Sequence, residues 1–198
     1  MGTTILSWTA VVLLLATSTG LLLNRDWRTD LGLLALQYVG AAILVAQHLP
    51  LGMAAAKVVT GWMATAALGM TLSALPARGE SVKQFWPTGR AFRLFMVGMI
   101  VVLTVSVTPR METAIPGLGM PVIAGGILLI GIGFLHLGTN SEIERVIYAL
   151  LTILTGFEVL YAGVESSILV TALLAVVNLG LGLVGAYLFN ASGAEGGA

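Results

Sequence analysis

Four polar side chains lie within apolar stretches of the sequence, where lipid would make them costly. They are Glu158, Lys57, Asn178 and His136. An ionisable group near the middle of a bilayer costs roughly 2.5–3.5 kcal/mol on insertion scales, and such residues commonly mark ion or proton pathways. A carboxyl, an amine, an amide and an imidazole together indicate proton transfer rather than bond-forming catalysis. The sequence has no cysteine and two histidines, so we expect no thiolate chemistry, no metal cluster and no cofactor on this chain.

Glu158 is the strongest candidate for a proton-carrying group. It lies about 15 residues past the start of the apolar stretch at 143–164, which is roughly 22 Å along a helix. Burial disfavours the charged form of a carboxyl, so this group is neutral unless it faces a cation or a water-filled path. We favour a carboxyl that takes up and releases protons. The alternative is a protonated carboxyl that hydrogen-bonds to a neighbouring helix.

Lys57 lies about six residues into the apolar stretch at 51–75. One interpretation is that its long stem carries the ammonium group to the outer membrane interface. The other is a buried amine that passes protons or pairs with a carboxylate. Thr60, Gln37 and Gln47 are the polar residues that we expect near it.

Asn178 and His136 are weaker candidates for the same path. Asn178 lies in the middle of the apolar stretch at 167–189, where an amide most commonly links two helices by a hydrogen bond. It is also able to order water along a proton path. His136 lies at the inner end of the stretch at 119–137. We expect it to act as an interfacial anchor, with titration near neutral pH as the alternative role.

Composition explains why these residues must be positioned by membrane helices. The chain has 198 residues, of which 58% are hydrophobic and 9% charged, whereas soluble domains carry about 25% charged residues. Its formal net charge of zero gives no indication of nucleic-acid binding. We therefore predict an all-α integral membrane protein of about seven transmembrane helices. The apolar stretches that predict them are 4–23, 31–48, 51–75, 92–108, 119–137, 143–164 and 167–189.

Two polar segments fall outside these stretches. The segment 76–93 combines basic and aromatic residues, a pattern typical of an interfacial loop or a short surface helix. The segment 191–198 consists mainly of glycine and alanine, and we expect a disordered tail there.

Basic residues between the predicted helices give the orientation. If the N-terminus is outside, seven basic residues lie inside and Arg110 alone lies outside. Positive residues concentrate on the cytoplasmic side of membrane proteins, so we predict an outside N-terminus, an inside C-terminus and a multi-pass protein of the inner (cytoplasmic) membrane. The seven inside residues are Arg25, Arg28, Arg78, Lys83, Arg90, Arg93 and Arg145.

Three short motifs in the last three predicted helices carry a family resemblance. They are Thr-Asn-Ser-Glu-Ile-Glu-Arg at 139–145, Gly-Phe-Glu at 156–158 and Ala-Val-Val-Asn-Leu-Gly-Leu-Gly-Leu at 175–183. This layout resembles the three-helix K subunit of NADH–quinone oxidoreductase and the C subunit of multi-subunit cation/proton antiporters. The resemblance implies that Glu158 matches the proton-path carboxylate of the K subunit. Asn178 stands about where the K subunit usually has a second acidic residue.

The whole chain resembles a longer relative of that module. This is the component E type subunit of membrane hydrogenases of the formate-hydrogenlyase kind, in which extra helices precede the module and one carries an intramembrane lysine. Lys57, upstream of Leu75-Pro76, is similar to that lysine. The resemblance implies a four-helix membrane segment over 1–110 and a K-like module over 111–190.

The function that we expect is that of a membrane subunit in an ion-translocating redox or antiporter complex, contributing to a proton path. The resemblance implies larger antiporter-like partner subunits and a soluble redox arm, which would hold any redox cofactors. This chain would then be a non-catalytic subunit of an oxidoreductase or antiporter. Two alternatives stay open: a purely structural subunit of such a complex, and a stand-alone transporter of small solutes or ions.

Overall fold

The computed structural model describes residues 2–74 and 89–195, which form seven α-helices. The predicted all-α class is confirmed. The helices are α1 (Gly2–Leu23), α2 (Trp27–Val45), α3 (Leu51–Ala74), α4 (Arg90–Ala114), α5 (Met120–Thr139), α6 (Ile143–Ala162) and α7 (Ile168–Glu195). Residues 76–88 of the predicted interfacial segment at 76–93 lie outside the described residues. Residues 90–93 of that segment belong to α4.

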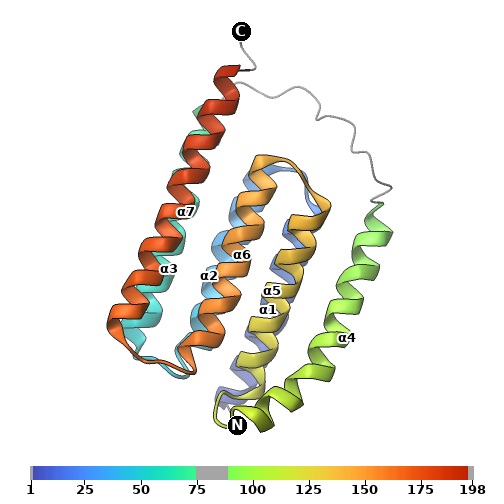
Figure 1. Cartoon of the computed structure of the whole chain (residues 1–198), viewed down its shortest axis with the longest axis vertical. Helices are drawn as coiled ribbons and strands as arrows, with labels where there is room; N and C mark the ends of the chain where they lie inside the picture. Colours follow the sequence, from blue (N-terminus) through green and yellow to red (C-terminus); the bar gives the residue numbers. More distant parts are fainter. Residues whose placement is uncertain (1, 75–88, 196–198) are drawn as a thin grey trace.

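The helices run up and down in alternation, so the start of α1 and the end of α7 lie at opposite ends of the bundle (Figure 1). Helix α6 has the central position, in contact with α2, α5 and α7. Helices α3 and α7 pack against each other on one side of the bundle, while α4 packs mainly against α5 on the other side. Helix α7 packs against both α3 and α6, so polar residues on these three helices are able to meet inside the bundle.

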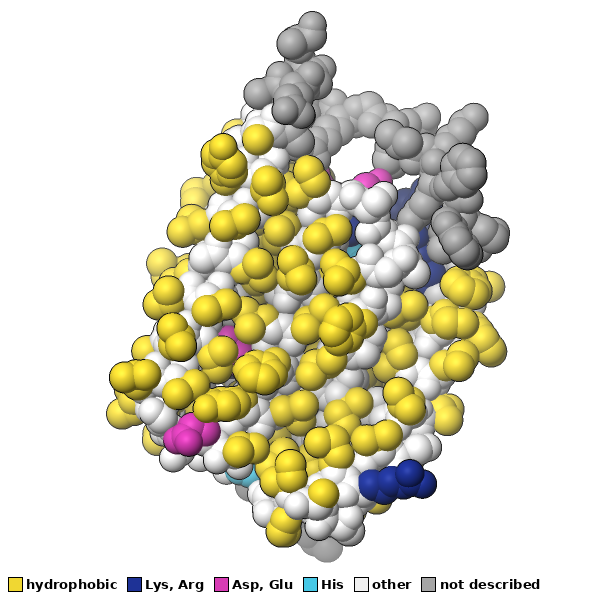
Figure 2. Space-filling model, in the orientation of Figure 1, with side chains coloured by type: hydrophobic (Ala, Val, Ile, Leu, Met, Phe, Trp, Pro, Cys, Tyr) yellow, Lys and Arg dark blue, Asp and Glu magenta, His cyan; other side chains and the backbone are white. Residues whose placement is uncertain are grey.

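Six of the helices among the described residues are long and apolar enough to cross a membrane. The exception is α6, which carries Glu144, Arg145 and Glu158. Of the about seven predicted spans, six therefore have the length and composition of a transmembrane helix. The outer surface agrees with a lipid environment, since hydrophobic side chains cover most of the face seen in Figure 2. Side chains more than half exposed include Val12, Met63, Val102, Phe134, Leu173 and Leu183.

Glycine brings α5 and α6 into close contact. A Cβ atom added at Gly156 would lie 2.8 Å from the backbone oxygen of Gly126 and 2.8 Å from the Cβ of Leu129. A Cβ added at Gly133 would lie 3.1 Å from the backbone nitrogen of Ile153. In membranes, small residues allow such close backbone approach and so hold helices together by packing. This contact fixes α6, and with it Glu158, against α5.

Two helices extend six residues beyond their predicted ends. Helix α4 continues through Pro109 to Ala114, although the sequence predicted an end at residue 108. A proline removes one backbone hydrogen bond, but neighbouring helices and threonine hydroxyls make it tolerable in membrane helices. Helix α7 continues to Glu195, so the tail that was predicted from residue 191 begins inside this helix.

Candidate ion-pair site

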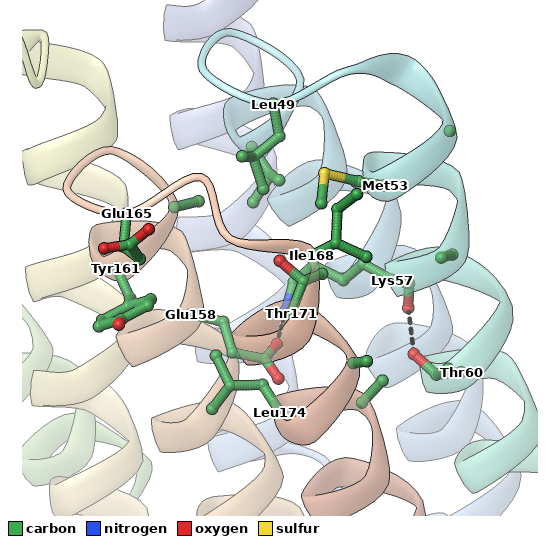
Figure 3. A pocket seen from close by; sticks show the side chains of 16 residues that line it. Leu49, Met53, Lys57, Thr60, Glu158, Tyr161, Glu165, Ile168, Thr171 and Leu174 are labelled. Carbon is green, nitrogen blue, oxygen red and sulfur yellow. Dashed lines mark hydrogen bonds and ion pairs between the residues drawn. The ribbon is translucent and has the colours of Figure 1, made fainter.

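The structure brings Lys57 and Glu158 together as a buried ion pair. Lys57 comes from α3 and Glu158 from α6, and the ammonium nitrogen Nζ contacts the carboxylate oxygen Oε2 (Figure 3). Each side chain is 8% exposed. An ion pair removed from water is stable only when the attraction between the two charges offsets a large desolvation cost. Two of the three ionisable residues of the predicted proton path therefore form a single site.

The ion pair lines a cavity of about 210 Å³ between α3, α6 and α7. The wall is mostly apolar, with polar groups contributed by Thr60, Tyr161 and Thr171. Figure 3 shows these side chains around the pair, with Glu165 in the connection between α6 and α7. Glu165 is exposed, so the cavity reaches from the buried pair to the surface of the bundle at this end.

The sequence left open whether the ammonium group of Lys57 reaches the membrane interface or is buried, and the structure shows that it is buried. Its ammonium group points to the carboxylate of Glu158 rather than outward to the interface. Of the polar residues expected near it, Thr60 is one turn away and donates a hydrogen bond to the Lys57 backbone oxygen at 3.1 Å. Gln37 instead donates to Thr152 Oγ1 at 3.3 Å, deeper in the bundle.

Asn178 lies on α7 in the interior of the bundle and is 1% exposed. The hydroxyl of Tyr38, on α2, donates a hydrogen bond to Asn178 Oδ1 at 2.8 Å. This is the interhelical hydrogen bond expected of an amide in a membrane helix. The nitrogen Nδ2 of Asn178 has no hydrogen-bond partner among the described residues.

His136 lies toward the other end of the bundle, away from the ion pair. It is 2% exposed, so it is buried and does not anchor at an interface as the sequence predicted. Asn140 donates a hydrogen bond to its backbone oxygen at 3.1 Å, and Arg93 and Arg145 are its charged neighbours. The two arginines also contact the C-terminal end of α1. The sequence alone did not indicate that His136 lies beside them.

Two buried arginines at this end are functional candidates that sequence reasoning missed. Arg93 donates a hydrogen bond to the backbone oxygen of Leu22 at 2.7 Å, and Arg145 donates to that of Asn24 at 2.9 Å. The last carbonyl groups of a helix lack partners within it and carry partial negative charge. The two arginines therefore neutralise the C-terminal end of α1. In the sequence they counted only as basic residues of the inside loops.

No known family model matches the chain, and no curated protein or solved structure is significantly similar to it. The class of the protein is therefore defined by its fold and site: over residues 2–74 and 89–195, a bundle of seven helices, six of them able to cross a membrane, that encloses a buried lysine–glutamate pair.

Proposed function

We propose that this chain is a multi-pass membrane subunit of an ion-translocating redox or antiporter complex, and that Glu158 and Lys57 carry protons within it. The observation that carries the proposal is the ion pair on the wall of a cavity at one end of the bundle. Polar groups inside membrane proteins are commonly functional. A pair that served only to join helices would have no need of a cavity beside it.

The proposed mechanism uses the mutual dependence of the two charges. While the ammonium of Lys57 contacts Glu158, it stabilises the ionised carboxylate. If the ammonium moves away or loses its proton, the carboxylate is left in a low-dielectric environment and binds a proton instead. A displacement of the lysine, driven by a partner subunit, would therefore load or unload Glu158. A proton reaches the pair from water in the cavity.

The proposed partner subunits rest on the family resemblance of the sequence. Larger antiporter-like subunits would provide the driving conformational change, and any redox centres would reside in a soluble arm. The distribution of basic residues supports the proposed orientation, in which the N-terminus and the cavity would both lie at the outer face of the inner membrane.

The direct test is Glu158→Gln in native membrane vesicles, with proton transport followed by a pH-sensitive dye. We expect transport to fall by about a hundredfold or more, in the range found for loss of an acid–base group, because the amide cannot exchange a proton. Glu112→Gln is the matched control, since Glu112 is a half-buried carboxyl on α4, away from the pair. Transport by Glu158→Gln at the rate of the unmodified protein would overturn the proposal and favour a purely structural role.

A second test addresses the partner subunits. Purification in a mild detergent is expected to recover this chain with larger membrane subunits, which mass spectrometry of the co-purifying chains would identify. Recovery of a homo-oligomer alone would contradict the proposed complex and favour a stand-alone transporter.

A further inference from the structure

A line of buried polar residues follows one face of α6. Its members are spaced by three or four residues, which makes each one a neighbour of the next on the helix surface, and all are at most 9% exposed. The first and last members are 13 residues apart, or about 20 Å along the axis at 1.5 Å per residue. The members are Arg145, Tyr148, Thr152, Thr155 and Glu158; we call this set the α6 polar line.

Polar side chains from α2 and α7 lie beside the α6 polar line. Gln37 donates a hydrogen bond to Thr152 Oγ1 at 3.3 Å. The hydroxyl of Tyr38 contacts the side chain of Thr155 and donates to Asn178 Oδ1 at 2.8 Å. Gln37 and Tyr38 are each 0% exposed. Three helices therefore place hydrogen-bonding groups along the same interior path.

Several of these groups are left incompletely hydrogen-bonded. Gln37 Oε1, Tyr148 Oη and Asn178 Nδ2 are buried and have no hydrogen-bond partner among the described residues. Buried polar atoms are nearly always satisfied, by protein groups or by ordered water. Neighbouring members of the line are about 5–6 Å apart at Cβ, a separation that one bridging water spans. The path thus has both the partners and the spacing that ordered water needs.

The α6 polar line connects the two ends of the bundle. At one end Glu158 meets Lys57 and the cavity. At the other end Arg145 contacts the C-terminal end of α1 through Asn24, and Asn24 donates to Asp30 Oδ1 at 3.0 Å. Asp30 is also close enough to Tyr148 and to Arg145 to interact electrostatically with both, so it lies at the far end of the line.

We propose that the α6 polar line is a hydrated proton route across this chain, from Glu158 past Thr155, Thr152 and Tyr148 to Asp30. The inference deepens the proposed function and rests on it, because it assigns the route by which Glu158 is emptied within the same chain. Each hydroxyl or water accepts a proton on a lone pair while it releases its own to the next oxygen. One O–H bond forms for each that breaks, and no other bond changes.

Thr155→Val tests the route, because it removes the hydroxyl at nearly constant volume. Thr104→Val on α4 is the matched control: Thr104 is 2% exposed and donates to Ile100 O at 2.8 Å, as Thr155 donates to Leu151 O at 2.7 Å. We expect proton transport in native vesicles to fall roughly tenfold with Thr155→Val, the factor that corresponds to one net hydrogen bond. Transport should be unchanged in Thr104→Val and restored in Thr155→Ser.

The outcomes separate the route from the proposed function. If Glu158→Gln stops transport while Thr155→Val leaves it unchanged, the route is wrong and the function of Glu158 survives. If Glu158→Gln also leaves transport unchanged, both are wrong. Equal losses in Thr155→Val and Thr104→Val would also overturn the route, since they would indicate a general packing effect.

A second measurement tests hydration without relying on transport. The chain has no cysteine, so Thr155→Cys introduces a single thiol into the full-length protein. Ag⁺, a small thiol-binding ion, is expected to reach it through water and to block later maleimide labelling of the denatured chain. Thr104→Cys should stay unprotected by Ag⁺. Equal protection of the two cysteines, or protection of neither, would overturn the hydrated route.

Discussion

Replacement of Lys57 by methionine is expected to lower the free energy of unfolding by about 3–5 kcal/mol, the usual cost of removing one partner from a buried ion pair. Methionine keeps the length and apolar stem of lysine but leaves the carboxylate of Glu158 without its cation. The side chains of the pair are each 8% exposed, so the unpaired carboxylate would stay largely buried. Unfolding of the detergent-solubilised protein by increasing SDS, followed by circular dichroism, would measure the loss.

The double variant Lys57→Met/Glu158→Leu distinguishes the effect of removing both charges from the effect of leaving one charge unpaired. Replacing both members of a buried ion pair by apolar residues is often neutral or stabilising, so we expect the double variant to recover most of the lost stability while losing proton transport. Arg110→Met is the control, because Arg110 is exposed and surface changes are usually within about 0.5 kcal/mol. A double variant as unstable as Lys57→Met alone would contradict this account.

The contrast between these variants has a functional meaning. An apolar pair at positions 57 and 158 would hold α3 against α6 at least as well as two charges do. Stability therefore gives no reason for an ion pair here, whereas proton transfer does. Under the proposed function, proton transfer accounts for the desolvation cost of the pair.

Much of the fold could be predicted from the sequence, because each apolar stretch is bounded by glycine, proline or charged residues. The helix positions follow from that pattern. The helix ends follow less well, since Pro109 normally ends a helix but is tolerated inside α4 in apolar surroundings. The sequence also predicted about seven spans, and six helices in the described part of the chain meet the requirements of length and composition.

The residues of the site could be predicted from the sequence, but their pairing could not. Glu158 and Lys57 stood out individually because each is costly in lipid, but their pairing depends on how α3 and α6 are rotated. That rotation comes from tertiary packing, such as Gly61 on α3 against the ring of Tyr38. The helical spacing of Thr152 and Thr155 is evident in the sequence. It did not indicate a functional role, because threonine in a helix commonly hydrogen-bonds to its own backbone.

The packing of α5 against α6 leads to the second large effect, in Gly156→Ala. The new Cβ would lie 2.8 Å from the Gly126 backbone oxygen and 2.8 Å from Leu129 Cβ, two atoms that are unable to rotate away. Overpacking of this kind typically costs about 1–3 kcal/mol, which exceeds the gain of up to about 1 kcal/mol from alanine's helix propensity. We therefore expect a net loss of stability in the SDS unfolding assay.

Gly180→Ala is the matched control, because nothing lies within 4 Å of a Cβ at that position in α7. There we expect only the gain in helix propensity, so the two glycine variants should shift stability in opposite directions. Gly156 precedes Glu158 by two residues, and separation of α6 from α5 would also change the distance from Glu158 to Lys57. Gly156→Ala should therefore reduce proton transport, and Gly180→Ala should not. Equal stability of the two variants would show that the α5–α6 contact is looser than the described packing and does not fix the position of Glu158.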